Sequence, residues 1–173
     1  MKLTVTGDIN SFYVQTLCMI FFPGEKFVEN QEITEYTPIM EVSVTNSENV
    51  SSAKATLTYK GKTVQAEKTV DFAPERTKQR TAKIAAGSAV LAVCTELLGY
   101  RPSWGMLTGV RPSKVAMEML LNGNSKAKVR KTLNNDYYVI PKKAALATDI
   151  ARREQKIIGK PDIKDCSIYI SIP

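Results

Sequence analysis

The chain has 173 residues, 43% of them hydrophobic, and its 24 Lys and Arg residues against 17 Asp and Glu residues give a formal net charge of +7. This composition is typical of a globular protein that can bury a core, and no apolar stretch approaches the ~18 residues that a membrane span needs. Histidine is absent, which excludes imidazole as a general base or a metal ligand. The apolar run at residues 17–22 is too short, with too little positive charge before it, for a signal peptide, and we expect a cytoplasmic protein.

The charge is divided unevenly along the chain. Residues 1–73 contain six Lys and Arg and nine Asp and Glu, a net −3, whereas residues 74–173 contain 18 against eight, a net +10. The shift coincides with a change from alternating to helical patterns. We therefore predict three parts: a small antiparallel sheet subdomain over residues 1–73, a basic helical subdomain over 74–160, and a linker with a terminal strand over 161–173.

The first part is predicted to be a small sheet with one helix. Alternation of polar and apolar residues predicts strands over residues 2–6, 39–45, 53–59 and 62–70, and a further short one over 26–29. A cap at Asn10 or Ser11 begins a helix that the Pro-Gly pair at 23–24 stops. The Lys-Gly pair at 60–61 predicts a tight hairpin turn. We expect an antiparallel sheet with one face in water, within an α+β fold.

A long helix is predicted to open the second part. It starts at Pro74 and ends at Gly99, and small residues at 85–89 make its middle thin enough for another backbone to approach closely. Four basic side chains in its opening turns are expected on a solvated face: Arg76, Lys78, Arg80 and Lys83.

Three shorter helical segments are predicted after this long helix. The first covers residues 112–121, the second is a short basic helix capped by Ser125, and the third begins at Pro141. Apolar residues at helical spacing give the third an aliphatic stripe, formed by Leu146, Ile150 and Ile157.

The cysteines do not predict a metal site or a disulfide framework. Cys18, Cys94 and Cys166 lie more than seventy residues apart, without the paired spacing that such sites use. Cys18 and Cys94 fall on apolar helix faces, where a cysteine is usually a small core residue. We therefore expect no catalytic residue and no metal ligand in this chain.

The segment WGMLTGVRPSK, residues 104–114, predicts an anion site. Gly109 frees the backbone just before a helix, and Arg111 and Lys114 lie at the positive end of that helix. An arginine there can hold a planar carboxylate with two hydrogen bonds. The alternative is that Arg111 only ties the loop to a neighbouring carbonyl or acid.

Two segments resemble one enzyme family. CSIYISIP, residues 166–173, resembles the first barrel strand of the oxygen-independent coproporphyrinogen III oxidases, in which a Tyr-x-x-Ile-Pro strand precedes the Cys-x-x-x-Cys-x-x-Cys motif of radical S-adenosylmethionine enzymes. Tyr169, Ile172 and Pro173 match that strand. LTGVRPSK, residues 107–114, resembles the N-terminal extension of the coproporphyrinogen dehydrogenase-like branch. Ser171 stands where the better-known branch has a histidine.

The resemblance implies that the chain precedes the barrel of a longer protein. That protein would hold a [4Fe–4S] cluster and S-adenosylmethionine, with Tyr169 close to the cofactor and Arg111 and Lys114 near a tetrapyrrole substrate. This chain would bind neither cofactor, because a cluster needs grouped thiolates and Cys166 alone cannot supply them.

Two functional hypotheses follow. The favoured one is a non-catalytic accessory domain of a radical enzyme of haem biosynthesis, which by resemblance performs the oxidative decarboxylation of coproporphyrinogen III to protoporphyrinogen IX. Its partner would be the barrel of the same polypeptide, with no membrane involved. The alternative is a basic nucleic-acid-binding module that uses the +10 helical part to neutralise phosphates. No single-stranded or zinc-based recognition motif accompanies those charges, so we expect no sequence-specific binding.

Overall fold

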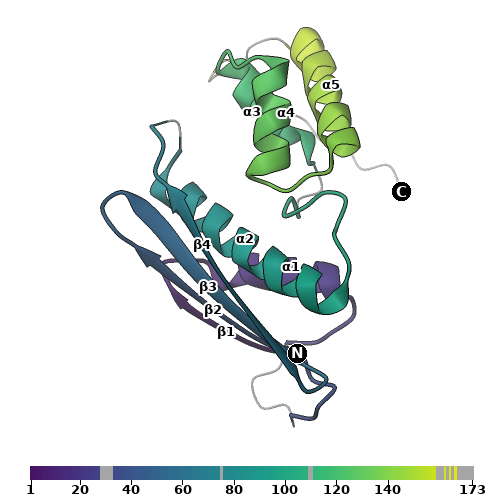
Figure 1. Cartoon of the computed structure of the whole chain (residues 1–173). Helices are drawn as coiled ribbons and strands as arrows, with labels where there is room; N and C mark the ends of the chain where they lie inside the picture. Colours follow the sequence, from purple (N-terminus) through teal and green to yellow (C-terminus); the bar gives the residue numbers. More distant parts are fainter. Residues whose placement is uncertain are drawn as a thin grey trace.

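The computed structural model describes residues 1–27, 33–74, 76–108 and 111–158, together with residues 162, 164 and 166. A four-stranded sheet lies beside two helices, and three further helices form a group at one end of the molecule (Figure 1). The elements in chain order are β1 (Lys2–Gly7), α1 (Ser11–Phe21), β2 (Ile39–Asn46), β3 (Val50–Tyr59), β4 (Lys62–Asp71), α2 (Lys78–Leu98), α3 (Ser113–Leu121), α4 (Lys126–Asn135) and α5 (Pro141–Ile158). The predicted α+β class is confirmed.

The sheet follows the order of the sequence, β1-β2-β3-β4. β2, β3 and β4 are antiparallel as predicted, and Lys60 and Gly61 both have positive φ in the two-residue turn between β3 and β4. β1, however, pairs parallel with β2, so the sheet is mixed. The reason is that α1 carries the chain back across the sheet before β2 begins, which is the connection that parallel strands require. The strand expected over 26–29 is absent at residues 26 and 27, and residues 28–29 lie outside the described part.

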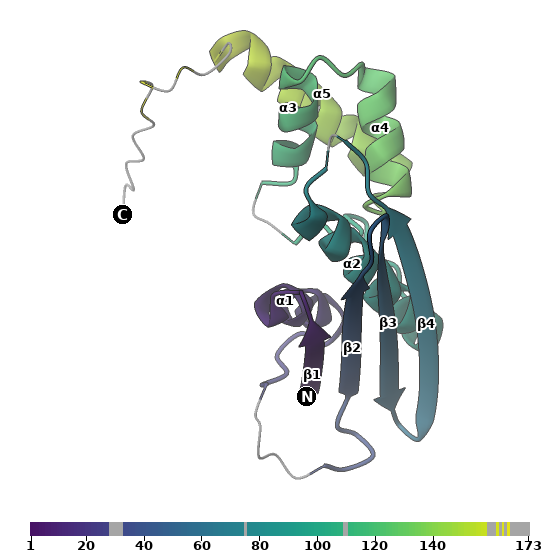
Figure 2. The ribbon, with the colours of Figure 1, turned by 90° about the vertical axis from the view of Figure 1, so that its left-hand side faces the viewer.

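One face of the sheet is covered by α1 and α2, and the other is open to water (Figure 2). Inward positions of the central strands are buried, among them Met40, Val42, Ala55 and Leu57. Outward positions carry mainly Thr, Ser, Glu and Lys side chains. This alternation gives the half-buried sheet that the polar and apolar pattern predicts.

Helix α2 is the central element of the core. Thr77 caps its start by accepting a hydrogen bond from the backbone N–H of Arg80, and Gly99 ends it in the left-handed conformation. The helix has the length and hydropathy of a membrane span, but two thirds of its apolar window is buried inside the fold. It packs along β3 and β4 on one side and α1 on the other. The boundary expected near residue 73 therefore falls between β4 and a helix that completes the core of the sheet.

The last three helices form a small group beyond the start of α2 (Figure 1). α5 packs against α3 and α4, so the helices predicted over this region are confirmed. Ser125 caps α4 as predicted, by accepting a hydrogen bond from the N–H of Lys128. The predicted terminal strand, residues 167–173, lies outside the described residues, and so does Tyr169.

Candidate functional site

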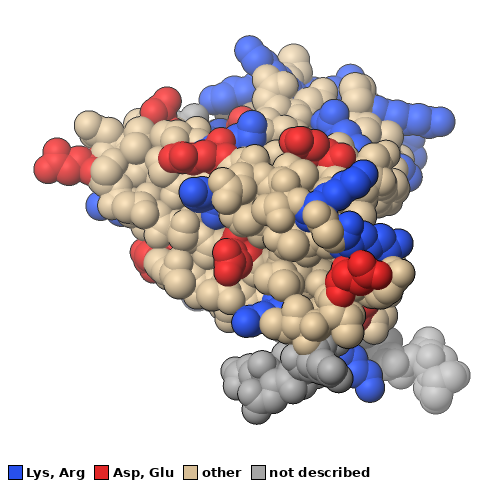
Figure 3. Space-filling view, turned by 60° about the horizontal axis from the view of Figure 1, so that its bottom comes forward, with Lys and Arg blue, Asp and Glu red and all other residues tan. Residues whose placement is uncertain are grey.

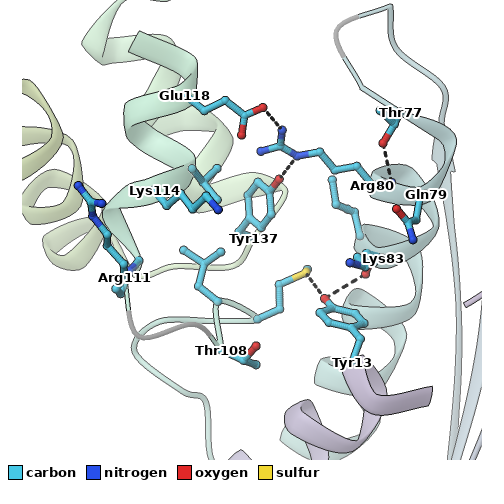
Figure 4. Close-up of a pocket in the computed structure, with 15 residues that line it drawn as sticks. Tyr13, Thr77, Gln79, Arg80, Lys83, Thr108, Arg111, Lys114, Glu118 and Tyr137 are labelled. Atoms are coloured by element: carbon cyan, nitrogen blue, oxygen red, sulfur yellow. Dashed lines mark hydrogen bonds and ion pairs between the residues drawn. The ribbon is translucent and has the colours of Figure 1, made fainter. Parts of the chain in front are cut away.

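A pocket of about 370 Å³ lies where the first turns of α2 face α3. The loop between these helices forms one wall, and Tyr13 of α1 and Tyr137, which follows α4, complete the lining (Figure 4). Segments separated by more than a hundred residues therefore meet around one cavity.

The floor of the pocket depends on a missing side chain in α2. A Cβ atom at Gly87 would lie 2.7 Å from the sulfur of Met106 and 2.7 Å from the phenolic oxygen of Tyr13. These two side chains fill the space that the glycine leaves, so the close approach at Gly87 is made by side chains and not by the backbone that the sequence led us to expect. Ile84, Leu107 and Val115 add apolar surface to the lining.

Tyr13 serves as a fixed wall of the pocket. Its hydroxyl donates a hydrogen bond of 3.2 Å to the backbone carbonyl of Lys83 and lies 3.7 Å from the sulfur of Met106. Burial, with a smaller contribution from Tyr137, raises the pKa of the Tyr13 phenol well above its ordinary value. The group therefore stays protonated and does not act as a base at neutral pH.

The loop that forms the outer wall is tied to the chain after α4. The backbone N–H of Met106 donates to the carbonyl of Tyr137 at 3.0 Å, and the N–H of Ile140 donates to the carbonyl of Ser103 at 3.1 Å. Gly105 makes this approach possible, since it has a φ of +57° and a Cβ there would lie 2.0 Å from the Tyr137 oxygen. The pocket wall is thus fixed by backbone contacts.

Four cationic side chains and one carboxylate line the pocket: Arg80, Lys83, Arg111, Lys114 and Glu118. Their charges sum to +3. Arg80 is the most constrained, because its Nε donates to the Tyr137 hydroxyl at 2.9 Å and its Nη1 lies 2.8 Å from the carboxylate of Glu118. Burial acts to lower the pKa of Arg80, but the interactions with Tyr137 and Glu118 outweigh it and hold that pKa above its ordinary value. Arg80 is therefore a permanent, oriented cation.

The two lysines of the pocket differ from its arginines in their surroundings. Lys83 is half-buried, with its ammonium 5.7 Å from the centre of the Tyr13 ring. Lys114 is exposed on the first turn of α3. Neither ammonium forms an ion pair with a carboxylate among the residues that the structure describes. These two groups are the ones available to an incoming anion.

Arg111 lines the pocket but already has a partner. Its guanidinium lies 3.0 Å from a carboxylate oxygen of Glu154 on α5, with the two side chains 58% and 27% exposed. In Figure 4 it points away from Arg80 and Lys83. The N–H of Lys114 bonds to the carbonyl of Arg111 at 3.0 Å, so one amide at the start of α3 is also occupied. The structure thus brings Arg111 and Lys114 to one pocket, while Gly109 and Val110 lie outside the described residues.

Sequence reasoning missed four members of this site: Tyr13, Arg80, Lys83 and Tyr137. The solvated face expected for the start of α2 is wrong for Arg76 and Arg80, which are half-buried and paired with Asp136 and Glu118. A signal was present, because Arg80, Lys83 and Gly87 follow at spacings of three and four residues and therefore share one stripe of the helix. No local pattern points to either tyrosine.

The chemistry of the pocket is that of binding. Cys18 and Cys94 are buried in the core, as predicted, and burial raises the pKa of Cys18 to about 12 and that of Cys94 further. Both thiols are therefore unreactive. No group of three potential metal ligands occurs among the described residues. A cationic rim over an apolar floor suits a flat or amphipathic molecule that carries carboxylates.

Comparison with known proteins gives one informative match. The chain is 29% identical over 172 residues to the oxygen-independent coproporphyrinogen-III oxidase-like protein HemZ of Bacillus subtilis (strain 168). The match covers 95% of this chain but 31% of the relative, so the chain spans about a third of that protein's length. The resemblance expected from the sequence is confirmed. No family model and no solved structure matches.

Proposed function

We propose that this chain is the N-terminal accessory region of a radical S-adenosylmethionine enzyme that acts on a porphyrin-type substrate. The observation that carries the proposal is the match along nearly the whole chain to a coproporphyrinogen-III oxidase-like protein about three times as long. The tyrosine-bearing segment at residues 166–173 supports it, because it resembles the strand that precedes the cluster motif in that family.

The residues of this chain do not fit a [4Fe–4S] cluster. Such a cluster needs grouped thiolates, whereas Cys18 and Cys94 are buried with raised pKa values and Cys166 is separate from them in sequence. We therefore place the cluster ligands, and the catalytic chemistry, in the part of the longer protein that this chain does not contain. No reaction step is assigned to the described residues.

The role proposed for the pocket is to receive carboxylates of the substrate. Lys83 and Lys114 supply charge that none of the described carboxylates neutralises, and Arg80 supplies a cation held in place by Tyr137 and Glu118. The apolar floor would contact the macrocycle or its side chains. Arg111 can join them by exchanging Glu154 for a substrate carboxylate.

Nucleic-acid binding is less well supported by the arrangement of charge. Several cations of the helical part are paired with acids, including Arg80 with Glu118, Arg111 with Glu154 and Arg130 with Asp149. On the face seen in Figure 3, acidic side chains lie among the basic ones and do not leave a continuous basic surface. A protein that tracks a phosphate backbone usually presents such a surface.

Anaerobic reconstitution with iron and sulfide tests the proposed class. The 173-residue chain should remain colourless, whereas the longer protein that contains it should bind a cluster and absorb visible light. A cluster formed stoichiometrically by the 173-residue chain would contradict the proposal. So would a longer protein that has no Cys-x-x-x-Cys-x-x-Cys motif after residue 173.

A further inference from the structure

Helix α5 has two unlike faces. Small side chains face the other helices and are buried, namely Ala144, Ala147, Thr148 and Ala151. The large aliphatic side chains Leu146, Ile150 and Ile157 are 46%, 41% and 84% exposed. Spacings of four and seven residues place these three on one stripe of the helix, which we call the α5 outer face.

The burial of side chains on α5 is the reverse of that in most surface helices. A surface helix normally buries its large apolar residues and exposes its small or polar ones. The alanines of α5 instead allow close contact with α3 and α4, and the aliphatic stripe that the sequence predicts is turned outward. Among the helices and strands, α5 has its main contacts with α3 and α4, and the three side chains of the stripe remain at least 41% exposed in the described structure. The α5 outer face is therefore built for a second contact.

We infer that the α5 outer face docks against the barrel of the same polypeptide. The inference rests on the proposed function, because it requires that barrel to follow this chain. The matched relative is about three times as long as this chain, which leaves a large body of protein to be placed. Exposed aliphatic side chains in a row are typical of the centre of such an interface.

The position of α5 in the chain favours the barrel as the occupant. α5 is the last described helix, and only residues 159–165 separate it from the segment that resembles the first barrel strand. Seven residues reach at most ~25 Å, about the length of α5 itself. A tether this short holds the barrel beside α5 at an effective concentration on the order of millimolar. Lys142 and Arg153 border the stripe and are exposed, so we expect acidic groups at the rim of the barrel surface.

Cleavage of the connection tests this docking. A specific protease site is placed between residues 159 and 165 of the full-length protein, the protein is cut, and the pieces are separated by gel filtration. The two wild-type pieces should elute together. Leu146→Lys with Ile150→Lys should separate them, because two ammonium groups would be buried in the contact. Thr45→Lys with Gln65→Lys adds the same charge at exposed positions on the open face of the sheet and should leave the pieces together.

Each other outcome contradicts the docking. Wild-type pieces that separate, or Leu146→Lys/Ile150→Lys pieces that stay together, would show that the α5 outer face does not hold the barrel. A stable dimer of the 173-residue chain that these substitutions dissociate would assign the α5 outer face to a second copy of the chain. Binding of the wild-type chain to anionic vesicles that these substitutions abolish would assign the face to a lipid surface. The iron content of the C-terminal piece distinguishes a failure of the docking from a failure of the proposed function. A C-terminal piece that holds iron but dissociates contradicts the docking alone. A C-terminal piece that binds no iron contradicts the proposed function.

Discussion

At the scale of single residues, the pocket depends on two kinds of side chain. Arg80 and Tyr13 are fixed by hydrogen bonds and shape the cavity, whereas Lys83 and Lys114 form no ion pair with an acid in the described part of the chain. Arg111 lies between these kinds, since it lines the pocket while paired with Glu154. Substitution of Lys114 therefore tests anion binding more directly than substitution of Arg111, because removal of Arg111 also leaves the carboxylate of Glu154 without its ion-pair partner.

The burial of each cysteine predicts how readily its thiol reacts. At pH 8 an alkylating reagent should modify Cys166, which is exposed, and leave Cys18 and Cys94 unmodified. After unfolding all three should react, and mass spectrometry counts the labels. Rapid modification of Cys18 in the native protein would contradict its burial.

The buried thiols also predict a loss of stability in alkali. The pKa of Cys18 is raised to about 12 in the folded state from an unfolded value of 9.0. Above pH 9 the unfolded chain releases this proton while the folded chain retains it, so the free energy of unfolding falls as the pH rises, by up to ~1.4 kcal/mol per pH unit for each such thiol. Urea titrations at pH 8 and pH 10 should show the decrease, and Cys18→Ala should reduce the difference between the two pH values.

Gly105 offers a test of the backbone contact that forms the pocket wall. Gly105→Ala should lower the free energy of unfolding by at least ~2 kcal/mol, since strain at positive φ adds to a clash with the carbonyl of Tyr137. Gly123 is the matched control because its φ is +80° but no atom lies within 4 Å of an added Cβ. Gly123→Ala should cost only ~1 kcal/mol. Equal losses in the two variants would contradict the close contact at Gly105.

At the scale of elements, the start of α2 links the fold to the pocket. The hydroxyl oxygen of Thr77 accepts a hydrogen bond of 3.1 Å from the backbone N–H of Arg80. The same turn directs the Arg80 side chain toward Tyr137. The Thr77 cap thus lies in the turn that also positions one cation of the pocket lining.

Substitution of the cap gives a prediction for this element. Thr77→Ala should lower the free energy of unfolding by ~1 kcal/mol, because the N–H of Arg80 loses its acceptor. Thr77→Ser keeps the hydroxyl and should lose much less. Thermal or urea unfolding of the three proteins measures the difference, and an alanine variant as stable as the serine variant would argue against a capping role.

Local patterns predicted most elements but not how they pack. Strands β2, β3 and β4 were recognisable because alternation with period two survives in a sheet with one wet face. The pairing of β1 was not, since nothing in residues 2–6 distinguishes parallel from antiparallel partners. α2 is apolar around most of its circumference, so its periodicity does not reveal that it packs on the sheet with one side and on α1 with another. The aliphatic stripe of α5 was found, but its outward direction is a tertiary property.

At the scale of the whole molecule, the pocket is a product of the fold. Its lining comes from α1, α2, the loop before α3, α3 and the segment after α4. Arg111 and Lys114 were predicted because they lie together in one motif, whereas Tyr13 and Lys83 are seventy residues apart and meet only through the approach at Gly87. Helices of the core and of the basic helical group thus combine to line one pocket with a cationic rim.

Two variants distinguish the two interpretations of Arg111, as a loop anchor or as a residue that binds a substrate carboxylate. If Arg111 is mainly an anchor, Arg111→Ala and Glu154→Gln should destabilise the fold by similar amounts and leave ligand affinity unchanged. If it receives a carboxylate, Glu154→Gln should raise the affinity, because the competing acid is removed, and Arg111→Ala should lower it by roughly tenfold or more. Arg111→Lys should recover only part, since lysine keeps the charge but lacks the planar fork.

The central claim, that the pocket receives the carboxylates of a tetrapyrrole, is tested most directly by a fluorescence titration of the 173-residue chain with coproporphyrin III. The free acid should bind at least tenfold more tightly than its tetramethyl ester, since only the acid offers anions to Lys83 and Lys114. Lys83→Met with Lys114→Met keeps most of the aliphatic length and should reduce that preference several-fold without loss of stability, with Arg80 and Arg111 supplying what remains. Equal affinity of the wild type for acid and ester, or an undiminished preference in the folded double variant, would contradict the account.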